Sequence, residues 1–405
     1  MKPSKLILLF ATIGLTAHSA LTFAADTLRP DVQKALFAAQ ELLKAQKPAD
    51  AMAKIKEAEA IPDRTDFENY TIAQLLGPAA AALGDNLQAA TAFDTMLNSG
   101  RAAPGDRLKL MQYAGISFYK AQHYPEAAKW LTAFFKEGGK DVQLRTVLGQ
   151  SLFMMGDFAT SAKEMGASVD ADIAAGQKPD KSQIQILANC YLKQKDMSGY
   201  AATLEKLITY YPTKEGWADL INQIASKTTF ASNLRLDAGR LRLATDNVRG
   251  PGDYMELGME ALEVYPAEAQ KILNEGFAKG VLGTGPDAKR QTELRDKAAK
   301  NAATDAKSLA SDEKKATAAK NGDPAVAVGF NFVTQGKLDK GIALMEQGLQ
   351  KGGLKHPDEA KLHLGVAYQY AGKKDKALET FKTVQGADGA ADLARLWTIL
   401  LTQQQ

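Results

Sequence analysis

KLHLGVAYQYAGKKDKALETFKTV, residues 361–384, contains two short amphipathic segments that meet at a glycine. A small residue in each of two packed helices lets them approach closely, while large apolar residues one turn away fill the space between them. The stretch therefore predicts a pair of antiparallel helices. Its defining positions are Leu364, Gly365, Tyr368, Gly372, Ala377 and Phe381.

The same spacing returns at four earlier places in the chain. The interval from Gly329 to Gly365 is 36 residues, and that from Gly115 to Gly149 is 34. Weaker or partial copies begin at Ala39, Ala188 and Gly258. Each of the four clear copies has a leading small residue in its first helix, a break position between the helices and a large residue in its second helix. The leading residues are Gly77, Gly115, Gly149 and Gly329, and the break positions are Gly84, Gln122, Gly156 and Gly336. The large residues, in the same order, are Phe93, Leu131, Met165 and Met345.

This pattern resembles the tetratricopeptide repeat, whose Leu-Gly, Tyr, Ala and Phe positions fall at these separations. The resemblance implies an all-α fold, a right-handed superhelical α-solenoid of tetratricopeptide and similar helical hairpins. One hairpin cannot bury both of its faces, so each is covered by its neighbours along the chain.

The repeats divide the chain into four predicted parts. Residues 1–24 form a signal peptide, residues 25–285 an N-terminal and central repeat array, and residues 323–405 a C-terminal pair of repeats. The last helix of that pair, about 391–401, carries one apolar stripe and caps the solenoid. Residues 286–322 are rich in Ala, Lys and Asp, and we expect two exposed bridging helices there, with disorder as the competing interpretation.

The first residues have the features of an export signal. Lys2 and Lys5 precede a short apolar stretch, and Thr22-Phe23-Ala24 ends in the small residues that signal peptidase accepts. The apolar stretch is shorter than the roughly 20 residues of a permanent membrane helix, and no later segment is apolar enough to cross a membrane. We therefore expect a periplasmic protein, or a secreted one, without an integral membrane span.

Composition limits the classes of partner. Without the two leader lysines, 48 basic residues face 47 acidic ones, so no strong field attracts nucleic acid. Cys190 is the single cysteine; it cannot form an intramolecular disulfide, and we expect it to be buried as a small apolar residue.

Motifs for catalysis are absent from the sequence. His123, His356 and His363 have no partner at metal-ligand spacing, and neither a phosphate-binding loop nor a Gly-x-Ser-x-Gly elbow occurs. We predict no catalytic residue, no cofactor and no metal site.

The resemblance implies that the first helix of every repeat lines a concave groove, in which an extended peptide or a partner helix binds. The exposed stripe of these helices carries amides between aromatic and aliphatic groups, and an amide pairs with any peptide backbone because it both donates and accepts. The competing interpretation is that the two aromatic rings simply pack between repeats. The candidate groove residues are Gln112, Tyr119, Gln150, Phe153, Gln185 and Asn189.

Three functional hypotheses follow. The first is a non-catalytic scaffold that binds a protein or peptide during envelope assembly or transport. The chain is loosely similar, in length and repeat layout, to exported proteobacterial repeat proteins that accompany the TonB-ExbB-ExbD system. The second is a self-associating structural solenoid without a foreign ligand, and the third is an accessory envelope enzyme.

Overall fold

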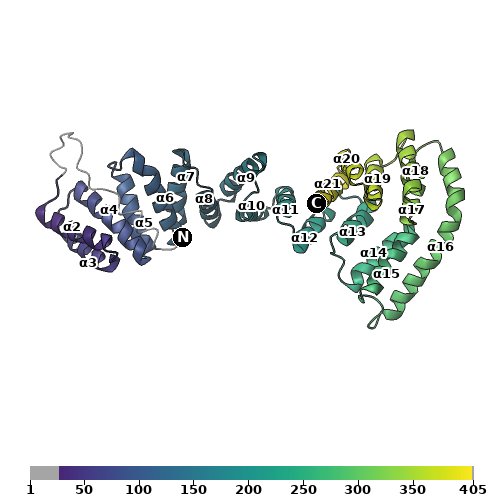
Figure 1. The fold of residues 1–405 in the computed structure, drawn as a ribbon, viewed down its shortest axis with the longest axis horizontal. Coiled ribbons are helices and arrows are strands. Elements are labelled where there is room, and N and C mark those ends of the chain that lie inside the picture. Colours follow the sequence, from purple (N-terminus) through teal and green to yellow (C-terminus); the bar gives the residue numbers. More distant parts are fainter. Residues whose placement is uncertain (1–26, 404–405) are drawn as a thin grey trace. The chain divides into compact units, whose positions relative to one another are not determined.

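A computed structural model describes residues 27–403 of the chain, so the predicted signal peptide, residues 1–24, lies outside the described residues. Within the described range the fold is all-helical, with twenty α-helices and one short 3₁₀ helix (Figure 1). This confirms the predicted fold class of consecutive helical hairpins. None of the described helices has the length and apolar character needed to cross a membrane.

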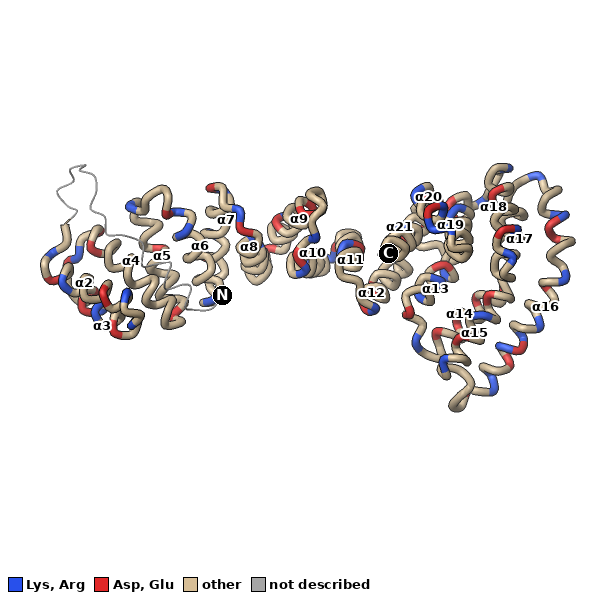
Figure 2. Tube along the Cα trace, viewed as in Figure 1, with Lys and Arg blue, Asp and Glu red and all other residues tan. Residues whose placement is uncertain are grey.

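The chain divides into two compact units, which we call unit 1 and unit 2, and the division falls between Asp196 and Met197. No boundary at this point was predicted from the sequence. Lysines and arginines are interspersed with acids along the helices of both units (Figure 2).

Unit 1 is a series of helical hairpins in which each helix packs against the next one along the chain. The first helices of successive hairpins also contact one another, α2 with α4, α6 with α8, and α8 with α10. The helices of unit 1 are α2 (Pro30–Lys44), α3 (Pro48–Glu59), α4 (Asp66–Leu83), α5 (Asn86–Asn98), α6 (Pro104–Lys120), α7 (Tyr124–Lys136), α8 (Val142–Met154), α9 (Phe158–Ala174) and α10 (Lys181–Gln194).

Each leading glycine lies against the large residue that the repeat pattern pairs with it. A Cβ atom at Gly149 would lie 2.6 Å from Met165, and one at Gly115 would lie 2.6 Å from Leu131. Both distances are shorter than a carbon–carbon contact allows, so the glycines permit the close approach of the two helices. The same relation holds for Gly77 with Phe93, Gly258 with Leu273, Gly329 with Met345 and Gly365 with Phe381.

The break positions of the repeats have left-handed backbone. Gly156 has a φ of 83° and Gly372 a φ of 68°, a region that glycine enters without steric cost. Gln122 takes the same conformation at 63°, although a side chain there is strained. The repeat register thus predicts where each hairpin turns, even where the residue is not glycine.

Unit 2 begins with α11 (Met197–Tyr210) and α12 (Lys214–Ala225), and then continues through the short 3₁₀ helix η1 (Ser232–Leu234) into α13 (Arg235–Ala244). Its remaining helices are α14 (Pro251–Val264), α15 (Pro266–Ala278), α16 (Ala288–Ala318), α17 (Asp323–Thr334), α18 (Leu338–Lys351), α19 (Pro357–Tyr370), α20 (Lys374–Lys382) and α21 (Ala390–Gln403).

The bridging segment differs from its prediction. Residues 286–322 do not contain two exposed helices, because α16 is one continuous helix of 31 residues. One side of it packs on α15 and α17. The buried positions recur at intervals of seven or four residues and so form a narrow seam along one side of the helix. This seam was not recognised in the sequence because most of its residues are alanines on a highly charged helix. The buried positions are Gln291, Ala298, Ala302, Leu309 and Ala316.

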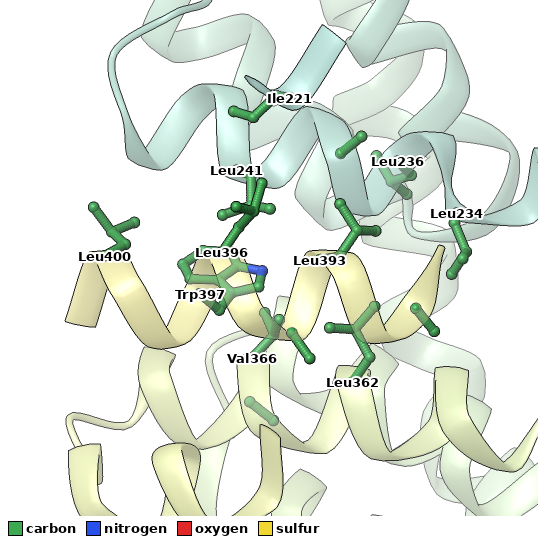
Figure 3. Close-up of a cluster of buried hydrophobic side chains, with 14 of the residues drawn as sticks. Ile221, Leu234, Leu236, Leu241, Leu362, Val366, Leu393, Leu396, Trp397 and Leu400 are labelled. Atoms are coloured by element: carbon green, nitrogen blue, oxygen red, sulfur yellow. The ribbon is translucent and has the colours of Figure 1, made fainter. Parts of the chain in front are cut away.

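The last helix, α21, is enclosed from two sides. It packs on α19 and α20, as a cap of the C-terminal repeats does, and it also packs on α11 and α13 at the start of unit 2. Figure 3 shows Trp397 and Leu393 of α21 between Leu241 on one side and Val366 on the other. Trp397 is only 1% exposed. Unit 2 therefore returns on itself, and its last helix joins its first ones.

Polar contacts accompany this closure of unit 2. Arg395 Nη2 lies 3.1 Å from Glu205 Oε1, and Lys227 Nζ lies 2.7 Å from Asp392 Oδ2. The backbone N–H of Ala231 also donates to the carbonyl of Asp388. Residues more than 150 positions apart in sequence are thus held together where the last helix of unit 2 meets its first ones.

Candidate functional site

The first candidate site lies in unit 1, where α6, α8 and α10 present their faces to one another. The N-termini of α8 and α10 are fixed by side-chain caps: Asp141 accepts from the backbone N–H groups of Gln143 and Leu144, and Asp180 accepts from that of Gln183. Such caps satisfy backbone donors that a helix start leaves unpaired. They set the start of each helix and therefore the register of the residues along it.

Four of the six predicted groove residues line one pocket of about 220 Å³ in unit 1. Because they come from three first helices, the pocket requires neighbouring repeats to be stacked. Met154 and Ile186 complete the lining, and the side chain of Met154 is 57% exposed. The predicted residues in the lining are Tyr119 of α6, Gln150 and Phe153 of α8, and Asn189 of α10.

A hydrogen bond fixes the centre of this pocket. The hydroxyl of Tyr119 donates to Oε1 of Gln150 at 2.7 Å, linking α6 to α8. Burial raises the pKa of the Tyr119 hydroxyl, so it remains a donor at neutral pH. With its oxygen engaged, Gln150 directs its amide N–H groups elsewhere, and they have no protein partner within residues 27–403.

Each aromatic ring of the pocket packs against a neighbouring ring with one part of its surface and is exposed in the pocket with another. Phe153 makes an edge contact with Phe158, with ring centroids 5.1 Å apart, and Tyr119 makes one with Tyr124 at 6.0 Å. Both Phe153 and Tyr119 are half-buried and line the pocket with the remaining surface. Packing between repeats, the competing interpretation, therefore accounts for part of each ring.

Outside the pocket lining, a buried amide links α10 to the start of α8. Nε2 of Gln183 donates to Thr146 Oγ1 at 3.1 Å and to the carbonyl of Val142 at 3.3 Å. Its Oε1 is buried and accepts no hydrogen bond from the described part of the chain. Asn189, in contrast, is exposed and has neither a donor nor an acceptor partner there.

The other two predicted residues lie outside this pocket. Gln112 is half-buried on α6, and Gln185 is exposed on α10. Met154 and Ile186, conversely, line the pocket but were not predicted. Helical spacing was the available signal, since Met154 follows Gln150 by four residues and Ile186 precedes Asn189 by three, which places each pair on one face.

The second candidate site is a buried ionic cluster in unit 2. The guanidinium of Arg240, on α13, donates two hydrogen bonds to Glu268 of α15, at 2.8 and 2.7 Å, and one to Asp237 at 2.6 Å. Nε2 of His363, on α19, lies 3.1 Å from the second oxygen of Asp237. Arg240 also faces the ring of Phe330 at 4.7 Å. The cluster therefore ties three helices of unit 2 together.

The charges of this cluster compensate one another. Burial alone favours the neutral acid of Asp237, but the neighbouring His363 and Arg240 outweigh it and lower the pKa of Asp237 to about 2. The two carboxylates raise the pKa of Arg240 above its ordinary value. Because all three guanidinium nitrogens of Arg240 donate to a carboxylate, the arrangement is suited to holding helices together.

This ionic cluster was not predicted from the sequence. His363 has leucine and lysine as its neighbours along the chain, and its partner Asp237 lies 126 residues away. A weak signal did exist: Asp237 and Arg240 interrupt the otherwise apolar run of Leu236, Ala238 and Leu241. Charged residues on the buried face of a helix require partners, but the sequence does not say from where they come.

Neither Cys190 nor a group of metal-ligating residues adds a third site within residues 27–403. The thiol of Cys190 is buried and donates to Ser161 at 3.2 Å, and burial raises the pKa of that thiol, as expected of a packed cysteine. No group of three or more His, Cys, Asp or Glu residues in the described part of the chain is arranged to hold a metal ion.

The tetratricopeptide repeat family model matches two segments of the chain, residues 186–214 and 359–386. The second contains most of α19, the whole of α20 and the whole of the 361–384 stretch, and the first contains most of the weaker copy that begins at Ala188. The resemblance to tetratricopeptide repeats is thus confirmed at these two segments. No curated protein matches the chain in sequence.

Several solved structures are similar to this chain. The MamA RS-1 ArsTM double mutant is 20% identical, covers 45% of this chain and 95% of its own, and gives a TM-score of 0.31. The TPR2AB domain of yeast Sti1, in a complex with pHSP90, is 14% identical over 74% of this chain and 100% of its own, with a TM-score of 0.25. Yeast Tom70 is 11% identical over 92% of this chain and 96% of its own, with a TM-score of 0.25.

Proposed function

We propose that the chain is a non-catalytic scaffold that binds a protein or peptide, and that unit 1 holds an extended segment of this partner along α6, α8 and α10. The observation that carries the proposal is the pocket in which Tyr119, Gln150, Phe153 and Asn189 meet. It combines polar groups that lack protein partners with partly exposed apolar ones, which is the composition of a peptide-recognition surface.

Each component of the pocket has a distinct task. The amide N–H groups of Gln150 donate to a backbone carbonyl of the ligand, and Asn189 both donates and accepts. The exposed parts of Phe153 and Met154 take an apolar side chain, and methionine adapts to side chains of different shape. The hydrogen bond from Tyr119 holds Gln150 in place, so little side-chain entropy is lost on binding.

The proposal is tested by photo-crosslinking from position 153. A photoreactive phenylalanine analogue replaces Phe153 in the full-length chain, and the cross-linked partner is identified by mass spectrometry. The affinity of that purified partner is then measured for the wild type and for the Gln150→Ala, Asn189→Ala double variant. We expect the double variant to bind about tenfold more weakly, since two hydrogen bonds are lost.

Gln177→Ala is the matched control, because Gln177 is an exposed amide in the loop between α9 and α10, outside the pocket lining. It leaves the affinity unchanged. The double variant also loses the hydrogen bond from Tyr119 to Gln150, so circular dichroism first establishes that it keeps the helical fold of the wild type. Equal affinity of wild type and double variant contradicts the proposed groove.

The cellular setting is a further part of the proposal. Export to the periplasm rests on the leader-like residues 1–24, and a role in envelope assembly or beside the TonB-ExbB-ExbD machinery rests on the likeness in length and repeat layout. Osmotic-shock fractionation of a C-terminally tagged chain tests the compartment. Retention of the tagged protein in the cytosol contradicts export.

The self-associating solenoid remains the second candidate, and one observation favours it: in unit 2 the inner surface of the repeats is already covered by α21. Multi-angle light scattering separates the two functions. A stable oligomer with no cross-linked foreign partner supports the structural solenoid, and a monomer that cross-links to a partner supports the scaffold. The enzyme hypothesis has no support in the described residues, where the buried ionic groups are engaged in holding helices.

A further inference from the structure

A pocket of about 540 Å³ lies inside unit 2, among α13, α15, α17, α19 and α21. This volume is within the range of roughly 300 to 1,000 Å³ that small-molecule sites occupy. The apolar part of its lining includes Leu243, Ile272, Val333 and Leu338. The pocket is open to solvent, because Tyr370 in its lining is 44% exposed and Lys271 is exposed, so a ligand can enter it from the surface.

The charged groups around this pocket are balanced except for one. Arg240 faces the two carboxylates of Glu268 and Asp237, and Asp237 is also paired with His363. Glu275 is 2.7 Å from Lys279 and accepts the hydroxyl of Tyr254. Lys271 lines the same pocket and has no ion-pair partner among residues 27–403. A positive charge is thus available to a ligand.

Two further donors in the pocket lining lack acceptors. The side chain of Tyr370 is 44% exposed, and its hydroxyl makes no hydrogen bond with the described residues. The surrounding protein raises the pKa of this hydroxyl above its ordinary value, so it stays protonated at neutral pH. The indole Nε1 of Trp397 is buried, and it has no acceptor in the described part of the chain either.

Nε1 of Trp397 is the buried one among these three donors, whereas Lys271 and Tyr370 are exposed to solvent at the mouth of the pocket. A buried donor without an acceptor destabilises a fold, and an acceptor group of a ligand relieves this. The carboxylates of Glu268 and Glu275 in the pocket lining already accept hydrogen bonds from the protein. The group that complements this lining is a hydrogen-bond acceptor with a negative charge. The aliphatic walls and the rings of Tyr370 and Trp397 require that this group be attached to an apolar body.

We propose that the pocket in unit 2 binds a small amphipathic carboxylate, an aromatic or branched aliphatic acid. The carboxylate forms an ion pair with Lys271 and accepts a hydrogen bond from Tyr370. The apolar body lies against Ile272, Val333 and Leu338. This site is separate from the peptide groove proposed for unit 1, and neither proposal depends on the other.

Isothermal titration calorimetry on the full-length chain tests the site with three probes of matched shape. These are naphthalene-2-carboxylate, the neutral 2-naphthalenemethanol and the cationic 2-naphthylmethylammonium. We expect saturable binding of the carboxylate at one site, binding at least tenfold weaker for the alcohol, and none for the cation.

Variants locate the bound probe. Lys271→Met removes the charge and keeps the apolar stem, and Tyr370→Phe removes only the hydroxyl. We expect Lys271→Met to weaken carboxylate binding about tenfold and Tyr370→Phe to weaken it about fivefold, as the loss of one charged and one neutral hydrogen bond predicts. Lys314→Met, at an exposed lysine of α16 away from the pocket lining, leaves binding unchanged.

Several results overturn the proposal. One is the absence of saturable carboxylate binding at millimolar concentration in a chain whose circular dichroism shows the folded, helical state. Another is equal affinity for the carboxylate and the alcohol. A third is an equal loss of affinity in Lys271→Met and Lys314→Met, which indicates attraction by surface charge alone. Tyr370→Phe keeps the ring, so the affinity of this variant reports the hydroxyl even if Lys271→Met is less stable.

Discussion

The first helices of the two units share one repeat register but carry different residues on the stripe that faces inward. One position after the leading small residue, the Gly149 and Ala188 repeats of unit 1 have Gln150 and Asn189, whereas the Gly329 and Gly365 repeats of unit 2 have Phe330 and Val366. The unit 1 residues are half-buried or exposed. Both unit 2 residues are 0% exposed.

The residues at the ends of this stripe follow the same division. In unit 1 they include Gln112 and Gln185, and in unit 2 they include Val326 and Leu362, which are buried. The inner face of unit 2 is filled by its own chain, since α21 packs on α19 and Arg240 of α13 packs on Phe330. A few positions per repeat thus separate a face open to a partner from a face that the chain covers itself.

The largest expected effect comes from breaking the ionic cluster that holds unit 2 closed. Arg240→Met leaves the carboxylates of Asp237 and Glu268 buried without their cation. Removing one partner of a buried ion pair destabilises a protein by roughly 3–5 kcal/mol. We expect hydrogen exchange to accelerate in α13, α15 and α19, while α6, α8 and α10 keep their protection.

A triple variant separates loss of the charge from loss of packing. Arg240→Met combined with Asp237→Asn and Glu268→Gln removes the uncompensated charges, so it regains part of the lost stability. If the triple variant is less stable than the single one, the destabilisation arises from side-chain packing and the electrostatic explanation is wrong.

An exchange of equivalent residues tests the comparison directly. Val366→Asn places the residue of unit 1 beneath α21, where it loses apolar burial and leaves an amide unpaired; we expect unit 2 to lose about 3 kcal/mol. The reciprocal Asn189→Val is at an exposed position and changes stability by less than about 0.5 kcal/mol. Hydrogen exchange of each unit measures both. Equal effects of the two substitutions contradict the assigned difference between the inner faces.

Acid should weaken unit 2 over a defined pH range. The pKa of Asp237 is about 2 in the folded protein, below its ordinary value of 3.8. Between these values the unfolded chain binds more protons, so the stabilisation is complete above about pH 4 and is lost as the pH falls toward 2. The shift corresponds to about 2 kcal/mol at neutral pH. Hydrogen exchange of α13 and α19 across this range measures the loss.

Unit 1 has its own acid-sensitive group, which makes a unit-resolved measurement necessary. The hydrogen bond from Arg29 lowers the pKa of Glu68 to about 2 despite its burial, and so Glu68 titrates in an overlapping range. Asp237→Asn removes the pH dependence of α13 and leaves that of α4. A dependence of α13 that persists in this variant assigns the titration to another group.

The repeat register could be read from the sequence because its determinants are local. Gly149 and Met165, or Gly365 and Phe381, are close in sequence, and the need for a small residue opposite a large one fixes their contact. The same register located the left-handed positions and placed Tyr119, Gln150, Phe153 and Asn189 on faces that meet in one pocket.

Features of unit 2 that depend on distant contacts could not be predicted in this way. The stripe of Trp397 and Leu393 predicts a buried helix face but does not reveal that α11 and α13 cover it. Asp237 and His363 lie 126 residues apart in sequence, so their contact depends on the tertiary arrangement of α13 and α19. The seam of α16 consists mainly of alanines, which contribute too little apolar surface to stand out on a charged helix.

The smallest expected effects concern the turns, and they test whether the difference between the units is confined to the inner stripe. Gly156 in unit 1 and Gly372 in unit 2 both have left-handed backbone. An alanine side chain costs about 1 kcal/mol in this conformation. Gly156→Ala and Gly372→Ala should therefore destabilise their own units by the same amount.

Gln122 allows the opposite substitution, because it is a residue with a side chain that already has left-handed backbone, at a φ of 63°. Gln122→Gly removes the steric cost but increases the entropy of the unfolded chain by a similar free energy. The net change in the stability of unit 1, measured by hydrogen exchange of α6 and α7, should be less than about 0.5 kcal/mol. A gain well above about 1 kcal/mol would mean that the turns of unit 1 are strained by more than their backbone conformation, and the two units would then differ in more than the residues of the inner stripe.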